Sequence, residues 1–349
     1  MLQRLRLGRH TVIHNTRSRA IVLAERRTCD FLDDPDLPGA NATLSEWRAA
    51  GLFDDAPYWP ERAIPLDATA HTRTLIFDGP AGPAAIALPE GMLSEQIEGM
   101  LSFCSSGDHA DTVPDYVIAA RDGHYTAHDA AGPVTETLTL DEARFFVIRA
   151  ICETLLGASN TAAVLHGAAV SLNGSALLLL GQSGSGKTTT ALGLLDAGCG
   201  LVADDFAPIH ASGRDVMAFP TPLGLKGSTL ALPEAQSVIA HANSDMRPHV
   251  NYVWPRSALS LGKSLPIVGI VFPRYTRDAP FSLERLPPEA AFISAISEGG
   301  RINPHHGSAA PLVHLFDTVP AWELRFERSE QSVPACLSLF ATALEGATL

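Results

Sequence analysis

The stretch Gly181-Gln182-Ser183-Gly184-Ser185-Gly186-Lys187-Thr188 matches the phosphate-binding pattern G-x-x-x-x-G-K-[ST], the P-loop, at every fixed position. The apolar run 176–180 before it predicts a short strand, and residues 188–195 after it predict a helix. A glycine-rich turn between a strand and a helix directs free backbone N–H groups to one point, at the positive end of the helix dipole. The chain is therefore expected to contain an α/β domain that binds nucleotide phosphates at this turn.

Each kind of residue in the P-loop has its own predicted task. The glycines let the backbone approach phosphate oxygens, Lys187 reaches the β- and γ-phosphates, and the Thr188 hydroxyl holds Mg²⁺. A chance match in a turn is the alternative, and the strand–helix context argues against it. The predicted nucleotide-binding residues here are Gly181, Ser183, Gly184, Ser185, Gly186, Lys187, Thr188 and Thr189.

Length and composition narrow the class of protein. A chain of 349 residues exceeds a typical single core, so two domains are expected. The net charge of −13 argues against nucleic acid or an anionic membrane as the main partner, because both require a basic face. Five scattered cysteines without C-x-x-C pairing, no apolar signal core and no long apolar run predict a cytoplasmic protein.

Residues 1–135 carry no catalytic motif and are dense in turn formers, with short predicted strands at 74–77 and 84–88. We interpret them as a small α/β accessory domain. His124 and His128 are spaced for a metal on a helix, but the residues between them favour a strand, on which they would lie too far apart to share an ion. They are predicted to be surface histidines, and residues 108–111 to be a solvated loop.

The domain that follows, 136–349, starts with a predicted helix over 139–156, which opens with the capping-box residues Thr139 and Glu142. Asn173-Gly174 lies between two apolar runs and predicts a hairpin. The strand 162–171 would then carry His166 beside the strand that leads into the P-loop.

The apolar strand 201–203 ends in Asp204-Asp205, about twenty residues after the P-loop. Carboxylates at a buried strand end are costly unless they bind a cation or a strong donor. Because Mg²⁺ bridges the β- and γ-phosphates, one aspartate can hold the metal while the other accepts a proton from an attacking hydroxyl. An acidic turn without chemistry is the alternative.

Leu165-His166-Gly167, the Asn-Gly hairpin, the P-loop and the Ala203-Asp204-Asp205 strand end occur in the order and spacing found in HPr kinase/phosphorylase. The chain more closely resembles HPr kinase-related proteins, some of which accompany lasso-peptide gene clusters and phosphorylate a serine of the precursor peptide. Segments 219–226 and 271–275 are also similar to that family, and the resemblance covers roughly 140–330. It implies an α/β fold with a P-loop-containing HPr kinase-like catalytic domain at 136–349, after the smaller accessory domain at 1–135.

The resemblance also implies roles for individual residues. Lys187 and Thr188 would contact phosphate and Mg²⁺, Asp204 would be the general base, and Asp205 would assist the metal or orient the site, with the assignment within the pair left open. His166 matches a family histidine that could tune the pKa of the carboxylates, although a strand histidine alone is more often a core residue. Lys226 and Arg274 are candidates for positive charge at the γ-phosphoryl group, with ordinary surface charge as the alternative.

One family feature is missing from the sequence. HPr kinase/phosphorylase carries an acidic-Ile-Arg-Gly segment that assists Mg²⁺ and phosphorolysis, and the nearest acidic candidate here, Glu234, lies in a different context. This difference argues against phosphorylase activity and against HPr itself as the acceptor.

The sequence thus predicts an ATP-dependent, Mg²⁺-requiring kinase that phosphorylates a serine-type hydroxyl of a peptide or small protein, with a lasso precursor peptide as one candidate. Residues 1–135 are expected to recognise that acceptor, and the resemblance implies a homo-oligomer. The alternatives are a small-molecule or carboxykinase-like phosphoryl transferase, and a nucleotide-dependent switch or ATPase. Adenine or guanine preference stays open, because the P-loop reads phosphates and not bases.

Overall fold

The computed structural model describes residues 1–55, 60, 62–67, 72–108, 112–225, 227–247 and 250–346. The fold is mixed α/β with several sheets, as predicted. The chain divides into two compact units, one formed by Met1–Pro57 with Ser159–Leu349 and the other by Tyr58–Ala158. This division differs from the predicted boundary at 135/136, because the first 57 residues group with the P-loop rather than with the segment that follows them.

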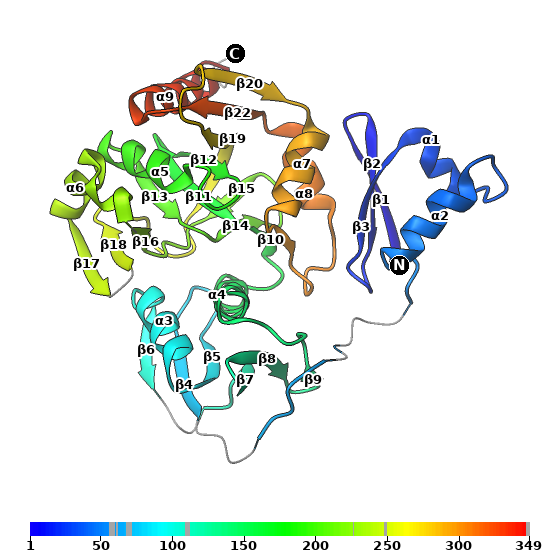
Figure 1. The fold of residues 1–349 in the computed structure, drawn as a ribbon, viewed down its shortest axis with the longest axis horizontal. Coiled ribbons are helices and arrows are strands. Elements are labelled where there is room, and N and C mark those ends of the chain that lie inside the picture. Colours follow the sequence, from blue (N-terminus) through cyan, green and yellow to red (C-terminus); the bar gives the residue numbers. More distant parts are fainter. Residues whose placement is uncertain are drawn as a thin grey trace. The chain divides into compact units, whose positions relative to one another are not determined.

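A mixed sheet forms the centre of the first unit (Figure 1). Its strand order is β13-β11-β12-β19-β15-β14-β10-β21, and β22 extends it by pairing with both β19 and β20. Strands β12, β19 and β22 are parallel to one another, and the other pairs are antiparallel. The strands are β10 (Thr161–Leu165), β11 (Gly167–Leu172), β12 (Ser175–Leu180), β13 (Gly200–Ala203), β14 (Ala207–His210), β15 (Asp215–Met217), β19 (Ser264–Tyr275), β20 (Ser282–Leu286), β21 (Arg301–Ile302) and β22 (Ala321–Phe326).

Helices cover both faces of this sheet. Alternation along β12 sends Leu178 and Leu180 into a core shared with α7 (Pro288–Ser297) and α8 (Ala310–Thr318). Leu177 and Leu179 enter a second core with α5 (Lys187–Asp196) and α9 (Ser329–Gly346). The strand that leads into the P-loop is thus buried on both faces, which fixes the position of the loop.

A smaller three-stranded sheet follows the acidic pair. Its order is β16-β18-β17, formed by β16 (Leu223–Leu225), β18 (Val250–Pro255) and β17 (Ala242–Arg247). Helix α6 (Pro233–Ala240) packs on it through Ala235 and Val238. Lys226 and residues 109–111 lie outside the described residues, so the predictions made for them stay predictions. Asp108, predicted to belong to the same loop, is instead the last residue of a strand, Ser105–Asp108.

The N-terminal strands β1 (Leu2–Leu7), β2 (His10–Asn15) and β3 (Ile21–Glu25) form an antiparallel sheet followed by α1 (Arg26–Cys29) and α2 (Ala40–Ala49). Leu7 and Val12 are fully buried in the same core as α7 and α8. The Gly8 N–H donates to Asp317 Oδ1 at 3.1 Å. These contacts explain why residues 1–57 belong with the P-loop unit.

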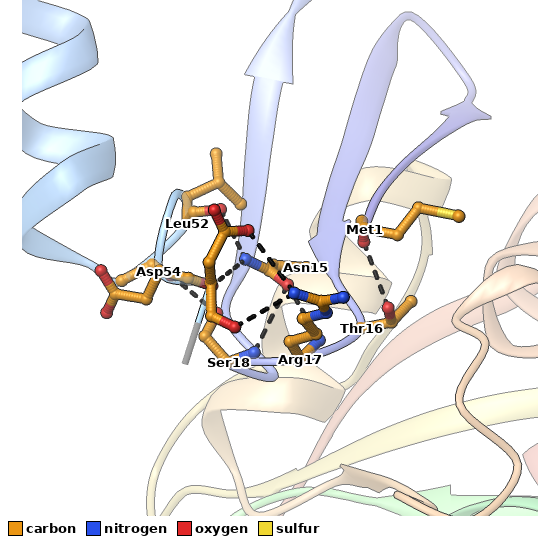
Figure 2. Close-up of polar contacts among 9 residues, drawn as sticks. Met1, Asn15, Thr16, Arg17, Ser18, Leu52 and Asp54 are labelled. Atoms are coloured by element: carbon orange, nitrogen blue, oxygen red, sulfur yellow. Dashed lines mark hydrogen bonds and ion pairs between the residues drawn. The ribbon is translucent and has the colours of Figure 1, made fainter. Parts of the chain in front are cut away.

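Asn15 holds the turn after β2 against the segment that follows α2 (Figure 2). Its Nδ2 group donates to the carbonyl oxygens of Leu52 and Asp54, both at 2.9 Å. Its Oδ1 atom accepts from the Arg17 N–H at 2.8 Å and from the Ser18 N–H at 3.3 Å. One buried amide therefore satisfies four backbone groups and joins two loops.

The second unit contains a six-stranded sheet of order β6-β4-β5-β7-β8-β9 with helices α3 (Met92–Met100) and α4 (Leu140–Leu156). Its strands are β4 (Thr72–Phe77), β5 (Ala84–Pro89), β6 (Ser105–Asp108), β7 (Tyr116–Arg121), β8 (His124–Asp129) and β9 (Gly132–Pro133). The two strands predicted here are present as β4 and β5. Both histidines lie on β8, as predicted, and His124 is exposed, but His128 is buried and its Nε2 atom lies 2.8 Å from the Ile64 carbonyl oxygen. The prediction that His128 is a surface residue is therefore wrong.

Local predictions for residues 139–196 agree with the structure except at His166. Helix α4 has the predicted capping box, and Asn173 and Gly174 adopt φ values of 51° and 81°, as a tight hairpin requires. The predicted strand 162–171 is instead broken at His166 into β10 and β11, which pair with different neighbours.

All five cysteines are free thiols, and four of them are buried. Among the described residues, no helix combines the length and the apolar character needed to cross a membrane.

Candidate active site

The P-loop connects β12 to α5 and depends on backbone angles that favour glycine. Gly181, Gly184 and Gly186 adopt φ values of 145°, 81° and 101°. At Gly186 a Cβ atom would lie 2.7 Å from Phe326 Cζ, so β22 approaches the loop too closely for a side chain there. The loop ends at α5, whose first residue is Lys187.

Lys187 is buried and folded back onto the loop that precedes it. Its Nζ atom donates to the Gly181 carbonyl oxygen and, at 3.1 Å, to the Gln182 carbonyl oxygen. Burial lowers the pKa of the ammonium group, while the negative charges of Asp205, Asp204 and Glu298 oppose that shift. All three carboxylates therefore lie within electrostatic reach of Lys187.

The acidic pair lies directly after β13, and its two members differ in environment. Asp204 is 3% exposed, and its Oδ1 atom has no hydrogen-bond partner among the described residues. Burial, followed by the nearby charge of Asp205, raises the pKa of Asp204 well above its usual range. Asp205 is partly exposed and adopts a left-handed φ of 60°.

Backbone contacts fix the acidic pair beside the hairpin. The Thr221 hydroxyl donates to the Asp204 carbonyl oxygen, and the Phe206 N–H donates to the same oxygen at 2.8 Å. The Gly167 N–H donates to the Asp205 carbonyl oxygen at 3.4 Å. The pair is therefore held between the end of β13 and the start of β11.

His166 lies at the break between β10 and β11 and joins this group. Burial lowers the pKa of its imidazole, the charge of Asp205 opposes the shift, and Lys187 adds to it. Sequence reasoning thus identified three kinds of side chain that the fold brings together: the P-loop lysine, the acidic pair and the histidine.

The remaining predicted residues of the loop differ in exposure. Ser183 and Gly184 are exposed, whereas Thr188 and Thr189 are half-buried at the start of α5. Ser185 is buried, and its Oγ atom lacks a hydrogen-bond partner in the described part of the chain.

Arg274, a further predicted residue, lies near the end of β19, with Nη2 3.5 Å from Glu298 Oε1 and Nε 3.6 Å from Glu323 Oε2.

Glu298 is a residue of the site that sequence reasoning missed. It follows α7 directly, its side chain is 13% exposed, and its charge acts on Lys187. No motif surrounds it, so only the fold identifies it. Glu234, the acidic candidate from the sequence, instead accepts a hydrogen bond from the Ser329 hydroxyl at the start of α9.

These groups fit a magnesium–nucleotide complex. Ser185 Oγ and Asp204 Oδ1 are buried oxygens without partners among the described residues, and the charge of Asp204 acts on the buried Lys187 ammonium group. Lys187 and the loop N–H groups can bind phosphate oxygens, and Thr188 with Asp205 can hold Mg²⁺. Asp204, within electrostatic reach of Asp205 and Lys187, can accept a proton.

Residues 158–223 match the model of the HPr Serine kinase C-terminal domain. The chain is 46% identical over 52 residues to HPr kinase/phosphorylase from Chlorobium phaeobacteroides, which covers 15% of this chain and 16% of that protein. It is 45% identical over 58 residues to HPr kinase/phosphorylase from Caldanaerobacter subterraneus subsp. tengcongensis, which covers 17% of this chain and 19% of that protein. The matches therefore span less than a fifth of these relatives.

The Hpr(Ser) kinase/phosphatase from Coxiella burnetii is a solved structure that aligns with 53% of this chain and 99% of its own, at 9% identity and a TM-score of 0.29. The family-model match, 158–223, contains His166, the P-loop and the acidic pair. Over 158–223 the chain is similar to the HPr Serine kinase C-terminal domain.

Proposed function

We propose that the HPr kinase-like segment makes this protein an ATP-dependent kinase that phosphorylates a serine-type hydroxyl on a peptide or small protein. The observation that carries the proposal is the buried Asp204, whose Oδ1 atom lacks a partner among the described residues and whose charge interacts with Lys187 and Asp205. A carboxylate base near a phosphate-binding lysine is what transfer to a hydroxyl requires.

The loop and Lys187 would bind and orient the triphosphate. In this arrangement Lys187 leaves the carbonyl oxygens of Gly181 and Gln182 and donates to phosphate oxygens, while loop N–H groups donate to the others. Bound Mg²⁺, held by Thr188 and Asp205, would supply positive charge to the phosphates.

Asp204 would accept the acceptor's hydroxyl proton as the reaction proceeds. The hydroxyl oxygen forms a bond to the γ-phosphorus, its O–H proton passes to Asp204 Oδ1, and the bond from the γ-phosphorus to the leaving oxygen of ADP breaks. Because burial raises its pKa, Asp204 is a stronger base once ionised than an exposed aspartate. His166, beside Asp205, would tune the charge of the pair.

The acceptor class follows from the relatives' name, since an HPr kinase acts on the protein HPr. The missing acidic-Ile-Arg-Gly segment favours a different acceptor here, of which a lasso precursor peptide is one candidate. We propose that residues in 1–135, which carry no catalytic motif, recognise this acceptor. The protein would use ATP with Mg²⁺ and act as a homo-oligomer in the cytoplasm.

The test is transfer from γ-labelled ATP with Mg²⁺ to a pool of serine-containing peptides, comparing the wild type with Asp204→Asn. Loss of the base should reduce labelled peptide roughly 10²–10⁴-fold. Asp215→Asn is the matched control, because Asp215 lies on β15 of the same unit and its carboxylate accepts a hydrogen bond from the Ser212 hydroxyl at 3.1 Å. It should leave the rate unchanged.

Other outcomes would redirect the proposal. Label that appears only in a metabolite pool would identify a small-molecule phosphoryl transferase. ATP hydrolysis without a labelled acceptor, unchanged in Asp204→Asn, would remove Asp204 as the base and favour a nucleotide-dependent switch or ATPase.

A further inference from the structure

The end of α7 brings a carboxylate to the first glycine of the P-loop. A Cβ atom on Gly181 would lie 3.6 Å from Glu298 Oε2, and this oxygen is buried without a hydrogen-bond partner among the described residues. The same Cβ position is 3.0 Å from Ser185 Oγ, which is also buried and unpartnered. Two buried oxygens without partners among the described residues therefore lie close to Gly181, the residue whose carbonyl oxygen accepts a hydrogen bond from Lys187 Nζ.

Glu298 is held in this orientation through its other oxygen. Oε1 lies 3.5 Å from Arg274 Nη2, and Arg274 is anchored next to the loop because the neighbouring Tyr275 N–H donates to the Ser185 carbonyl oxygen at 2.9 Å. Glu323 also contacts the guanidinium group, at 3.6 Å. Arg274 thus forms ion pairs with two carboxylates, and these pairs compete with a phosphate for its charge.

The balance of charge around the loop is therefore negative. Asp205 and Glu298 act on Lys187, the buried Asp204 adds a further negative charge when it is ionised, and Arg274 is shared between Glu298 and Glu323. A free triphosphate would add several negative charges to this surplus, at short range and in a partly buried site where screening is weak. Bound magnesium would offset that charge, and its water ligands could donate to orphaned oxygens such as Glu298 Oε2.

We propose that Glu298 is a positioning and selectivity residue that makes the site bind the magnesium complex of a nucleoside triphosphate and reject the free triphosphate. This inference rests on the proposed nucleotide site but assigns a residue outside every motif in the sequence. Its carboxylate repels phosphate oxygens that lack a metal and supports the hydration shell of the metal when one is bound.

The experiment is calorimetric titration of the full chain with ATP, once with excess Mg²⁺ and once with EDTA. The readout is the dissociation constant measured with EDTA divided by the dissociation constant measured with Mg²⁺. This ratio can be measured without turnover. Glu298→Gln should bind free ATP more tightly and reduce this ratio at least tenfold, as expected for loss of one charge within about 12 Å of the phosphates at an effective dielectric constant of about 20.

Two further variants control the result. Glu289→Gln makes the same change in the first turn of α7, where Glu289 lies 3.4 Å from His10 Nδ1, and should leave the ratio unchanged. Arg274→Gln removes the counter-charge from Glu298 and should shift the ratio in the opposite direction, so the idea stays testable if Glu298→Gln does not fold.

The possible outcomes separate this inference from the proposed function. If the wild type binds no nucleotide under either condition, the nucleotide site itself is refuted. If the wild type binds ATP but Glu298→Gln and Arg274→Gln both keep the wild-type ratio, Glu298 has no role in selecting the magnesium complex.

Discussion

At the scale of single residues, two glycines of the P-loop share a positive φ but differ in their surroundings. A Cβ on Gly186 would lie 2.7 Å from Phe326 Cζ, whereas a Cβ on Gly184 would meet nothing within 4 Å. Gly184→Ala therefore carries only the cost of a left-handed alanine, about 1–2 kcal/mol. Gly186→Ala adds a steric clash with β22, and we expect it to lower the unfolding midpoint further and to abolish nucleotide binding.

A double variant tests the origin of this difference. The thermal unfolding midpoint of Gly186→Ala should lie clearly below that of Gly184→Ala. Adding Phe326→Leu to Gly186→Ala should recover part of the lost stability. Equal destabilisation by the two alanines would show that the approach of Phe326 does not shape the loop.

His14 on β2 predicts a dependence of stability on pH. Burial lowers the pKa of its imidazole to about 4, and Nδ1 lies 3.2 Å from Gln3 Oε1, which can accept a hydrogen bond from Nδ1–H. The unfolded chain binds a proton below about pH 6.5 while the folded chain does not, so stability falls between pH 6.5 and 4. The predicted loss is about 3 kcal/mol, since each pKa unit corresponds to about 1.4 kcal/mol.

Hydrogen exchange of the β1–β3 amides, corrected for intrinsic rates, measures this effect. Protection should decrease from pH 7 to pH 5 in the wild type and change much less in His14→Gln. The exposed His124, replaced in the same way, serves as the control and should keep the wild-type response in β1–β3.

At the scale of elements, the start of α4 is fixed by a reciprocal cap. The Glu142 N–H donates to Thr139 Oγ1 at 3.4 Å, and the Thr139 N–H donates to Glu142 Oε2 at 2.8 Å. Thr139→Ala removes one partner and should destabilise α4 by about 1 kcal/mol, whereas Thr139→Ser should retain the cap. Exchange rates of the amides in 140–156 report the difference, and identical rates in both variants would mean that the cap does not stabilise the helix.

Elements whose boundaries depend on local chemistry were predictable from the sequence. The Asn173-Gly174 turn, the α4 cap and the strand–loop–helix of the P-loop each have a residue type required by backbone geometry. The break at His166 has no such signal, because β10 and β11 separate only where their partners in the sheet diverge. Glu298 could not be predicted for the same reason, since α7 reaches the loop only through tertiary packing.

At the scale of the whole molecule, the division of the chain follows burial rather than turn density. Turn formers are frequent throughout 1–135, which made that segment look like one domain. Leu7 and Val12, however, are fully buried in the core of the P-loop unit, and β1 contacts α8. Sequence composition does not show which core a strand joins, because an apolar strand residue has the same pattern in either.

This division predicts how truncated proteins behave. A protein comprising 136–349 lacks β1–β3 and the Gly8–Asp317 hydrogen bond, and it carries α4 without the sheet it packs on. It should aggregate or unfold at a lower temperature, because the apolar surface that β1 and β2 cover on α7 and α8 becomes exposed. Residues 58–158 contain their own sheet and helices and should unfold cooperatively when expressed alone. Circular dichroism melts of both proteins decide the matter: a stable, nucleotide-binding 136–349 together with an unfolded 58–158 would restore the boundary at 135/136.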